Sequence, residues 1–404
     1  MTRILCCWEF GGGYGHLFRL RPIGEALAER GSQVIYALRD VERGRPILEG
    51  HAADIVQAPV WHVPPRAHPL SQTYAQNLWR NGYWHGESLK NQLQGWLALF
   101  DAYRPDLILA EHAPSALLAA RKAGLPRAAI GTGFSLPPLT SPIPCLPPWF
   151  ALPETHLVQS EAKFLDGVNR VLQDLGAAPL AAVAEIFEGA ARFLCTWPEL
   201  DHYGVRLDTR YWSPVIYSPD EIDAPWISSQ RDNIFVYLKP QYRFFHPIIE
   251  WLRESKQPTL VFAPGLDPAE RDALEGDTLT ITPHPVNLSS AATRCRLMIS
   301  HGGHNAGALM LLAGVALFIC PMELEQAVWA HRLRAQGLAD MVNFFNPDSD
   351  IRRNIGAALE SPQLAEHVNT FAVKYRHFDS NAMVLDLATR CLTLFAKTRD
   401  GRRE

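Results

Sequence analysis

Residues 297–326, LMISHGGHNAGALMLLAGVALFICPMELEQ, decide how this chain folds. The apolar run 297–300 is typical of a buried strand, Gly302 and Gly303 form a turn, and a helical pattern follows. A second apolar run, 315–320, is followed by another helical stretch. Strands that alternate with helices in this way form βαβ units with a parallel sheet. The segment therefore predicts an α/β domain of the Rossmann-like kind.

The turn at Gly302 and Gly303 is also a candidate anion site. A helix that begins after a glycine turn presents free backbone N–H groups and the positive end of its dipole. Glycine lets a phosphate approach closely, and a diphosphate is the ligand we expect. A plain strand-to-helix turn that needs glycine only for its geometry is the alternative. The flanking His301 and His304 favour the anion site.

The same alternation extends through the rest of the chain. Further strands are predicted at 3–10, 33–38, 106–110, 127–131, 233–238, 259–263 and 278–282. A proline-rich segment, 134–153, excludes regular helix and central strand and indicates a surface loop. The chain has 404 residues, which is more than one core of roughly 250 to 300 residues accommodates.

A polar, proline-rich passage at 212–229 interrupts the alternation. We therefore expect a first domain over 1–213, a linker over 214–232, a second domain over 233–380, and a C-terminal helix with a basic tail over 381–404. The fold class is α/β, with two Rossmann-like domains.

Composition narrows the class of protein. Hydrophobic residues make up 47% and charged residues 20% of the chain, which is globular composition. A formal net charge of -4 predicts no nucleic-acid partner. The seven cysteines form no CxxC pair, so we expect reduced thiols and a cytoplasmic protein. No segment approaches the roughly 20 apolar residues that a membrane-spanning helix needs. Contact with a membrane surface stays open, and the sequence does not predict the oligomeric state.

A set of residues after 284 carries a family resemblance. It comprises Pro285, His301-Gly302-Gly303, Gly314-Val315, Pro321, Glu325-Gln326, Ala330 and Gly337. Their spacing resembles the donor-binding signature of the UDP-glycosyltransferase-like family 1, which includes bacterial macrolide and antibiotic glycosyltransferases. The resemblance implies the GT-B fold, in which two Rossmann-like domains face each other across a cleft. It also implies metal-independent sugar transfer from a nucleoside diphosphate sugar.

The resemblance assigns roles to particular residues. It implies that the diphosphate is held by His301, Gly302, Gly303 and Asn305, and His304 is a further donor-binding candidate in the same turn. It implies that Glu325 and Gln326 bind the sugar, and a carboxylate beside an amide suits hydroxyls that both donate and accept. Pro283 stands where the family has an aromatic base-stacking residue, so His284 or the backbone of Val286 would face the base.

Two departures bear on the nucleotide. Ala306 and Leu309 stand where many UDP-using members have a Ser or Thr and a Glu that binds the ribose hydroxyls. We therefore consider a dTDP-linked donor, whose deoxyribose lacks the 2'-hydroxyl, as probable as a UDP-linked donor.

The N-terminal turn, GGGYGHLFR at 11–19, has His16 where a dinucleotide fingerprint needs its third glycine. It resembles instead the GxGH turn of the same glycosyltransferases, whose histidine is the general base of inverting members. The resemblance makes His16 the base, with Gly13 and Gly15 in the turn on the donor side. An imidazole is suited to this role because its ordinary pKa is about 6.5. A hydrogen-bonded structural histidine is the alternative.

A base histidine works better when a carboxylate orients it. Glu111 follows the predicted strand 106–110 at its carboxyl end, where ligands bind in open α/β sheets. Asp106, at the start of that strand, is the competing candidate.

Two weaker signals remain. Asp348-Ser-Asp350 matches a metal-binding DxD motif, but helix N-capping explains it more simply. We predict no metal site and no cofactor beyond the nucleotide sugar. The aromatic residues Trp61, Tyr74, Trp79, Tyr83, Trp84 and Trp96 are candidates for an acceptor pocket or for ordinary core.

The prediction is an inverting glycosyltransferase that acts on a hydroxyl of a small or lipidic acceptor. A nucleotide-sugar epimerase on the same fold and a non-catalytic glycosyltransferase-like auxiliary protein are the alternatives.

Overall fold

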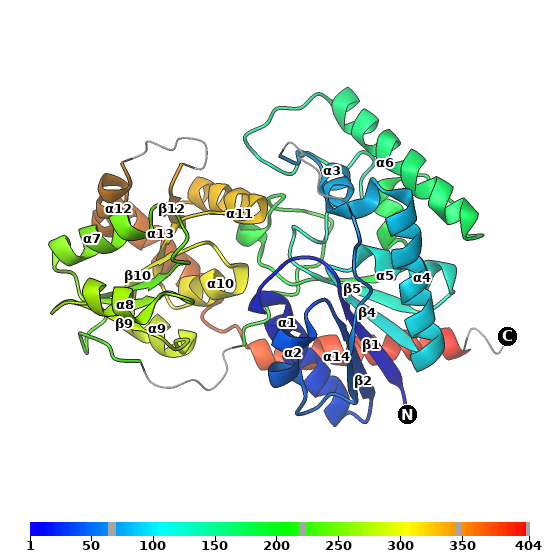
Figure 1. Ribbon diagram of the computed structural model, residues 1–404, viewed down its shortest axis with the longest axis horizontal. Helices are drawn as coiled ribbons and strands as arrows, with labels where there is room; N and C mark the ends of the chain where they lie inside the picture. Colours follow the sequence, from blue (N-terminus) through cyan, green and yellow to red (C-terminus); the bar gives the residue numbers. More distant parts are fainter. Residues whose placement is uncertain (64–69, 218–223, 344–349, 401–404) are drawn as a thin grey trace. The chain divides into compact units, whose positions relative to one another are not determined.

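The computed structural model describes residues 1–63, 70–217, 224–343 and 350–400. The chain forms two compact units (Figure 1). The first unit combines Met1–Val215 with Asp379–Glu404, and the second unit is Ile216–Phe378. Each unit contains one parallel six-stranded sheet, so the predicted α/β class with two Rossmann-like halves is confirmed.

The sheet of the first unit has the strand order β3-β2-β1-β4-β5-β6. Its strands are β1 (Arg3–Trp8), β2 (Gln33–Leu38), β3 (Asp54–Gln57), β4 (Leu107–Glu111), β5 (Arg127–Gly131) and β6 (Ala191–Leu194). Strand β1 is apolar almost throughout because both of its faces are covered: Leu5 and Cys7 pack into one core, and Ile4 and Cys6 into the other. The order reverses between β1 and β4, and ligands of open α/β sheets bind at such a reversal.

Helices cover the two faces of this sheet (Figure 1). They are α1 (Tyr14–Glu29), α2 (Val41–Leu48), α3 (Tyr74–Leu78), η1 (Trp79–Tyr83), α4 (Gly86–Tyr103), α5 (Pro114–Lys122), α6 (Glu154–Asp174), η2 (Val183–Phe187), η3 (Pro198–Leu200) and α14 (Ser380–Asp400). Helix α14 packs against α1, and Leu387 and Cys391 enter the same core as Ile4. The last helix of the chain thus belongs to the first unit. The proline-rich segment 134–153 has neither helix nor strand, as predicted.

The sheet of the second unit has the order β12-β11-β10-β7-β8-β9. Its strands are β7 (Asn233–Tyr237), β8 (Thr259–Phe262), β9 (Leu279–Thr282), β10 (Cys295–Ser300), β11 (Ala316–Ile319) and β12 (Ala339–Met341). Its helices are α7 (Phe245–Ser255), α8 (Pro268–Leu274), α9 (Leu288–Arg294), α10 (His304–Leu312), α11 (Leu324–Ala335), α12 (Ile351–Glu360) and α13 (Pro362–Tyr375). The order reverses between β10 and β7.

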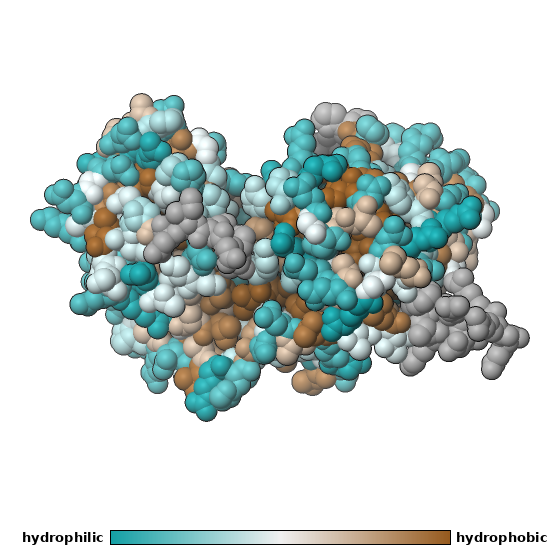
Figure 2. Space-filling view, turned by 90° about the horizontal axis from the view of Figure 1, so that it is seen from below, coloured by the Kyte–Doolittle hydropathy of each residue, from teal (hydrophilic) through white to brown (hydrophobic). Residues whose placement is uncertain are grey.

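Parts of three expected segments lie outside the described residues: 218–223 of the linker, 64–69 beside the aromatic residues, and 401–404 of the basic tail. Within the described chain, no helix is both long enough and apolar enough to span a membrane. On the face drawn in Figure 2, hydrophobic patches are interspersed with hydrophilic residues.

Candidate functional site

His16 and Glu111 meet at the strand-order reversal of the first unit. Strand β4 ends at Glu111, and His16 lies in the first turn of α1, which follows β1. The Nδ1 atom of His16 lies 2.6 Å from Oε2 of Glu111. Glu111 is fully buried, whereas 15% of the His16 side chain is exposed. The competing Asp106 lies at the opposite end of β4, where it accepts a hydrogen bond from the backbone N–H of Arg3 at 2.8 Å.

The sequence analysis missed a third member of this group. Arg19 donates from Nη1 to Oε1 of Glu111, so each carboxylate oxygen has its own cationic or potentially cationic partner. Burial alone would raise the pKa of Glu111, but the charges of His16 and Arg19 outweigh it and lower the pKa to about 2. Glu111 is therefore a carboxylate at any physiological pH. The spacing of three residues between His16 and Arg19, which places both on one helix face, was the available signal.

The glycine turn before α1 is shaped around the His16 ring. Gly11 has a φ of +84°, and a Cβ at this position would lie 2.2 Å from Nε2 of His16. Gly13 precedes α1 as its N-cap and provides no side-chain cap, while Gly15 has open space where a side chain would be. The ring of Trp8 stacks on that of His16, with centroids 5.3 Å apart. Only a residue without a side chain fits at position 11 while His16 keeps this orientation.

Buried polar groups surround the pair. His112 follows Glu111 with a φ of +44°, and its ring centroid lies 6.0 Å from that of His16. Burial and the nearby His16 lower the pKa of His112 to about 3, so its ring is neutral. Glu9, at the end of β1, accepts from Nε1 of Trp61 at 2.8 Å and from the backbone N–H of Ser115 at 3.0 Å. Burial raises the pKa of Glu9 to about 7 despite these bonds.

The aromatic residues divide between site and core. Tyr74, Tyr83 and Trp96 are fully buried core residues. Trp61 is partly exposed and stacks on Phe10, whose ring in turn meets that of His112. Of this set, Trp61 is the member that extends the His16 surroundings toward solvent.

The glycine turn of the second unit lies at the carboxyl end of β10. Gly302 has a φ of +88°, and a Cβ there would come within 2.8 Å of Cγ2 of Ile319. Gly303 is the N-cap of α10 and has open space beside it. No side chain caps this helix. His304 is its first residue, largely buried with its ring 5.5 Å from that of Trp329, and Asn305 follows.

The ring of His301 is engaged by backbone groups on both sides. Its Nδ1 lies 2.8 Å from the carbonyl oxygen of Cys320, and its Nε2 accepts the backbone N–H of Lys239 at 2.9 Å. Burial lowers the pKa of His301, and the charge of Lys239 lowers it further. The ring therefore ties together the ends of β10, β11 and β7. It would bind a diphosphate itself only by exchanging one of these bonds.

Glu325 and Gln326 lie in the first turn of α11. The Oε1 atom of Gln326 accepts from the backbone N–H of Met322 at 2.7 Å and of Glu323 at 3.2 Å. Glu323 and Gln326 form a capping box, in which each side chain accepts a backbone N–H of the other residue. The amide oxygen of Gln326 thus has a structural role, and its amide nitrogen is the group left for a sugar hydroxyl.

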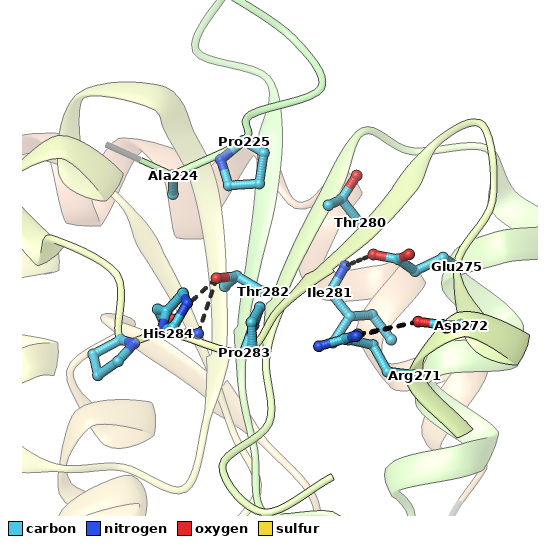
Figure 3. A pocket seen from close by; sticks show the side chains of 11 residues that line it. Ala224, Pro225, Arg271, Asp272, Glu275, Thr280, Ile281, Thr282, Pro283 and His284 are labelled. Atoms are coloured by element: carbon cyan, nitrogen blue, oxygen red, sulfur yellow. Dashed lines mark hydrogen bonds and ion pairs between the residues drawn. The ribbon is translucent and has the colours of Figure 1, made fainter. Parts of the chain in front are cut away.

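His284 lines a pocket of about 440 Å³ (Figure 3). The pocket runs along β9 to the loop that follows it, and α8 contributes Arg271 and Asp272 to its wall. Thr282 orders the loop through Oγ1, which accepts from the backbone N–H of His284 at 3.2 Å. The side chain of Val286 is buried, so only its backbone is available to a ligand.

The described residues contain no group of three or more His, Cys, Asp or Glu side chains placed to hold a metal ion. Asp350 is the N-cap of α12 and accepts from the backbone N–H of Arg353, whereas Asp348 lies outside the described residues.

Solved structures similar to this chain are glycosyltransferases. The glycosyltransferase VinC in complex with dTDP superposes with a TM-score of 0.70 at 14% identity and covers 98% of this chain and 100% of its own. The calicheamicin glycosyltransferase CalG4 has a TM-score of 0.67 at 17% identity and covers 97% of this chain and 98% of its own. SnogD from Streptomyces nogalater has a TM-score of 0.63 at 17% identity and covers 97% of this chain and 99% of its own.

No protein-family model matches the chain, and no curated protein sequence does. The structural likeness extends over nearly the whole chain and agrees with the resemblance at residues 285–337. The chain therefore has the two-unit GT-B fold of these glycosyltransferases.

Proposed function

We propose that this protein is an inverting glycosyltransferase that moves a sugar from a nucleoside diphosphate to an acceptor hydroxyl, with His16 as general base. The observation that carries the proposal is the 2.6 Å contact between His16 Nδ1 and the buried carboxylate of Glu111. The contact lies at the strand-order reversal, where ligands bind in this kind of sheet. An orienting carboxylate beside a partly exposed imidazole is the arrangement of an acid–base pair.

The pair dictates where protons move. Glu111 accepts a hydrogen bond from Nδ1–H of His16, so Nε2 is the atom that takes the proton of the acceptor hydroxyl. The acceptor oxygen bonds to the anomeric carbon as the bond from that carbon to the phosphate oxygen breaks. Attack opposite the leaving group inverts the anomeric configuration. The electron pair leaves with the nucleoside diphosphate, and Glu111 stabilises the imidazolium that forms.

The donor is proposed to lie along the carboxyl edge of the second sheet. The diphosphate lies against the turn after β10, and the base lies against the loop after β9, where His284 and the backbone of Val286 are available. Three strand spacings, about 14 Å, separate the carboxyl end of β10 from that of β9. This distance is of the order of the length of an extended nucleoside diphosphate. Glu325 and Gln326 at the start of α11 then bind the sugar.

The nucleotide is proposed to be dTDP or UDP. The solved structures of VinC and SsfS6 each contain thymidine diphosphate (dTDP). Ala306 and Leu309 bring no hydroxyl or carboxylate to the ribose, which suits a deoxyribose. The donor is a co-substrate, and we propose no further cofactor.

The acceptor is proposed to be a small or lipidic natural product that binds beside Trp61 and Phe10. A lipidic acceptor would bring the protein to a membrane surface. All seven cysteines are free thiols, which suits the reducing cytoplasm.

Two experiments test the proposal. A thermal-shift series with dTDP, UDP and ADP should show stabilisation by one of the first two, and no shift with any of them would refute the donor site. Release of nucleoside diphosphate from a candidate donor without acceptor, followed by mass spectrometry, should fall at least 100-fold in His16→Gln. Donor binding with no turnover in the unsubstituted protein would favour an auxiliary protein, and an altered but still linked sugar would favour an epimerase.

A further inference from the structure

A bound diphosphate needs positive charge, and the ring of His301 does not supply it. Its Nδ1 donates to the Cys320 carbonyl and its Nε2 accepts from the Lys239 N–H, which defines a neutral imidazole. Burial lowers the pKa of His301 and so favours the same neutral form. If the proposed function holds, a side-chain cation beside this turn would supply charge in addition to the backbone N–H groups at the start of α10.

Lys239 lies just beyond the end of β7, the strand next to β10. Its backbone N–H donates to His301 Nε2 at 2.9 Å, so its backbone is attached directly to the turn. The residue is exposed, and across the described parts of the chain its ammonium group has no ionic partner. Its charge acts on the His301 ring, where it contributes to the lowered pKa. Lys239 is thus an uncompensated cation anchored at the turn.

The strand order places Lys239 on the path of the donor. Strand β7 stands between β10, which carries the glycine turn, and β8, beyond which β9 leads to the pocket of Figure 3. One strand spacing, about 4.8 Å, separates neighbouring strand ends. A nucleoside diphosphate that reaches from the β9 loop to the β10 turn therefore passes the end of β7 with its phosphates.

We propose that the ammonium group of Lys239 binds the diphosphate of the donor and stabilises it as it leaves. A lysine ammonium is a compact charge that suits phosphate oxygens. It would act together with the uncapped backbone N–H groups at the start of α10. The sequence signal was a lysine at a strand end beside the strand-order reversal.

Arg243 is the rival cation on the same connection. Its guanidinium lies over the ring of Phe244, 4.5 Å from the centroid. Lys239 is preferred because its own backbone is bonded to the His301 ring.

The test is isothermal titration of dTDP and UDP, and of thymidine and uridine, into the protein and three variants. Lys239→Met removes the charge, Lys239→Arg keeps it, and Lys256→Met removes an exposed charge that follows α7 at the amino end of β8. Loss of one charge-assisted hydrogen bond should weaken diphosphate binding by Lys239→Met about 10- to 100-fold. Lys239→Arg and Lys256→Met should stay within about 3-fold of the unsubstituted protein, and nucleoside binding should not change in any variant.

Each outcome decides one question. Equal diphosphate affinity in Lys239→Met and Lys256→Met overturns the role of Lys239 and leaves the donor site standing. A parallel loss of nucleoside binding in Lys239→Met also overturns it, because the effect would then be structural. If the unsubstituted protein binds no nucleoside diphosphate, the proposed function fails and this inference fails with it.

Discussion

Replacing Gly11 with alanine tests whether the turn before α1 exists to position His16. The added Cβ would lie 2.2 Å from His16 Nε2, whereas ordinary contact begins at 3.4 Å, so the ring has to move by about 1.2 Å. Displacement of a catalytic group by about 1 Å can cost roughly 100-fold in rate. The positive φ of +84° adds about 1–2 kcal/mol of backbone strain. Gly11→Ala should therefore lose both stability and activity.

Gly31→Ala is the matched control. Gly31 has a nearly equal φ of +80°, but open space lies where its Cβ would be. Urea unfolding should show both variants destabilised by about 1–2 kcal/mol. Donor hydrolysis, with water as acceptor, should fall about 100-fold in Gly11→Ala and less than about 3-fold in Gly31→Ala. If the two variants hydrolyse the donor equally well, the turn does not position His16 and the argument is refuted.

Three further predictions concern the same two sites. Glu111→Gln should slow donor hydrolysis by about 10³- to 10⁴-fold. It should also lower the free energy of unfolding by about 3 kcal/mol, because the buried Arg19 loses the negative charge beside it. Glu111→Asp, measured alongside, should retain most of the stability, and equal stability of both variants would contradict this. Gly302→Ala should abolish the thermal shift by dTDP or UDP, since its Cβ would meet Ile319 at 2.8 Å, whereas Gly314→Ala, with a φ of +75° and its nearest contact at 3.5 Å, should keep it. The folded-state pKa of His112 is lowered to about 3, so its contribution to stability is complete above pH 6.5 and is lost as the pH falls toward 3. Glu9, with its pKa raised to about 7, makes the protein less stable as the pH rises from about 4.5 to 7, which opposes the effect of His112. The pH dependence of stability is therefore compared with that of His112→Asn, because asparagine tolerates the positive φ at this position. From pH 6.5 to 5 the wild type should lose up to about 2 kcal/mol more than this variant, and parallel urea-unfolding curves would show that His112 does not contribute.

Local patterns were enough to predict the fold. The predicted strands are short apolar runs, and the glycine turns at 11–15 and 302–303 precede helices, so the α/β alternation is visible in single segments. The short strands β3, β6 and β12 were not predicted, because DIVQ, ARFL and ADM mix polar with apolar residues. The two glycine positions that carry the sites, Gly11 and Gly302, need positive φ values, which is a local requirement. The capping box of Glu323 and Gln326 also depends only on a local sequence pattern, but the family resemblance assigned Gln326 to sugar binding.

Local patterns did not predict which side chains the site residues contact. The sequence alone nominated His16 together with either Glu111 or Asp106, and these two carboxylates lie at opposite ends of β4. Which of them meets His16 depends on the parallel pairing of β1 with β4, in which Trp8 stands beside Glu111. Because β1 and β4 are about 100 residues apart in the chain, no local pattern contains that pairing.

The amino-acid sequence by itself determined the α/β alternation, the two glycine turns and the choice of His16 and His301. Only the tertiary structure decided that Arg19 shares Glu111 with His16, that α14 returns to the first unit, and that the ring of His301 is held by Lys239 and Cys320. The physical reason is that secondary structure follows from the spacing of residues along the chain. The charge and hydrogen-bonding state of a side chain, in contrast, depends on groups that folding brings beside it from 19 to 95 residues away.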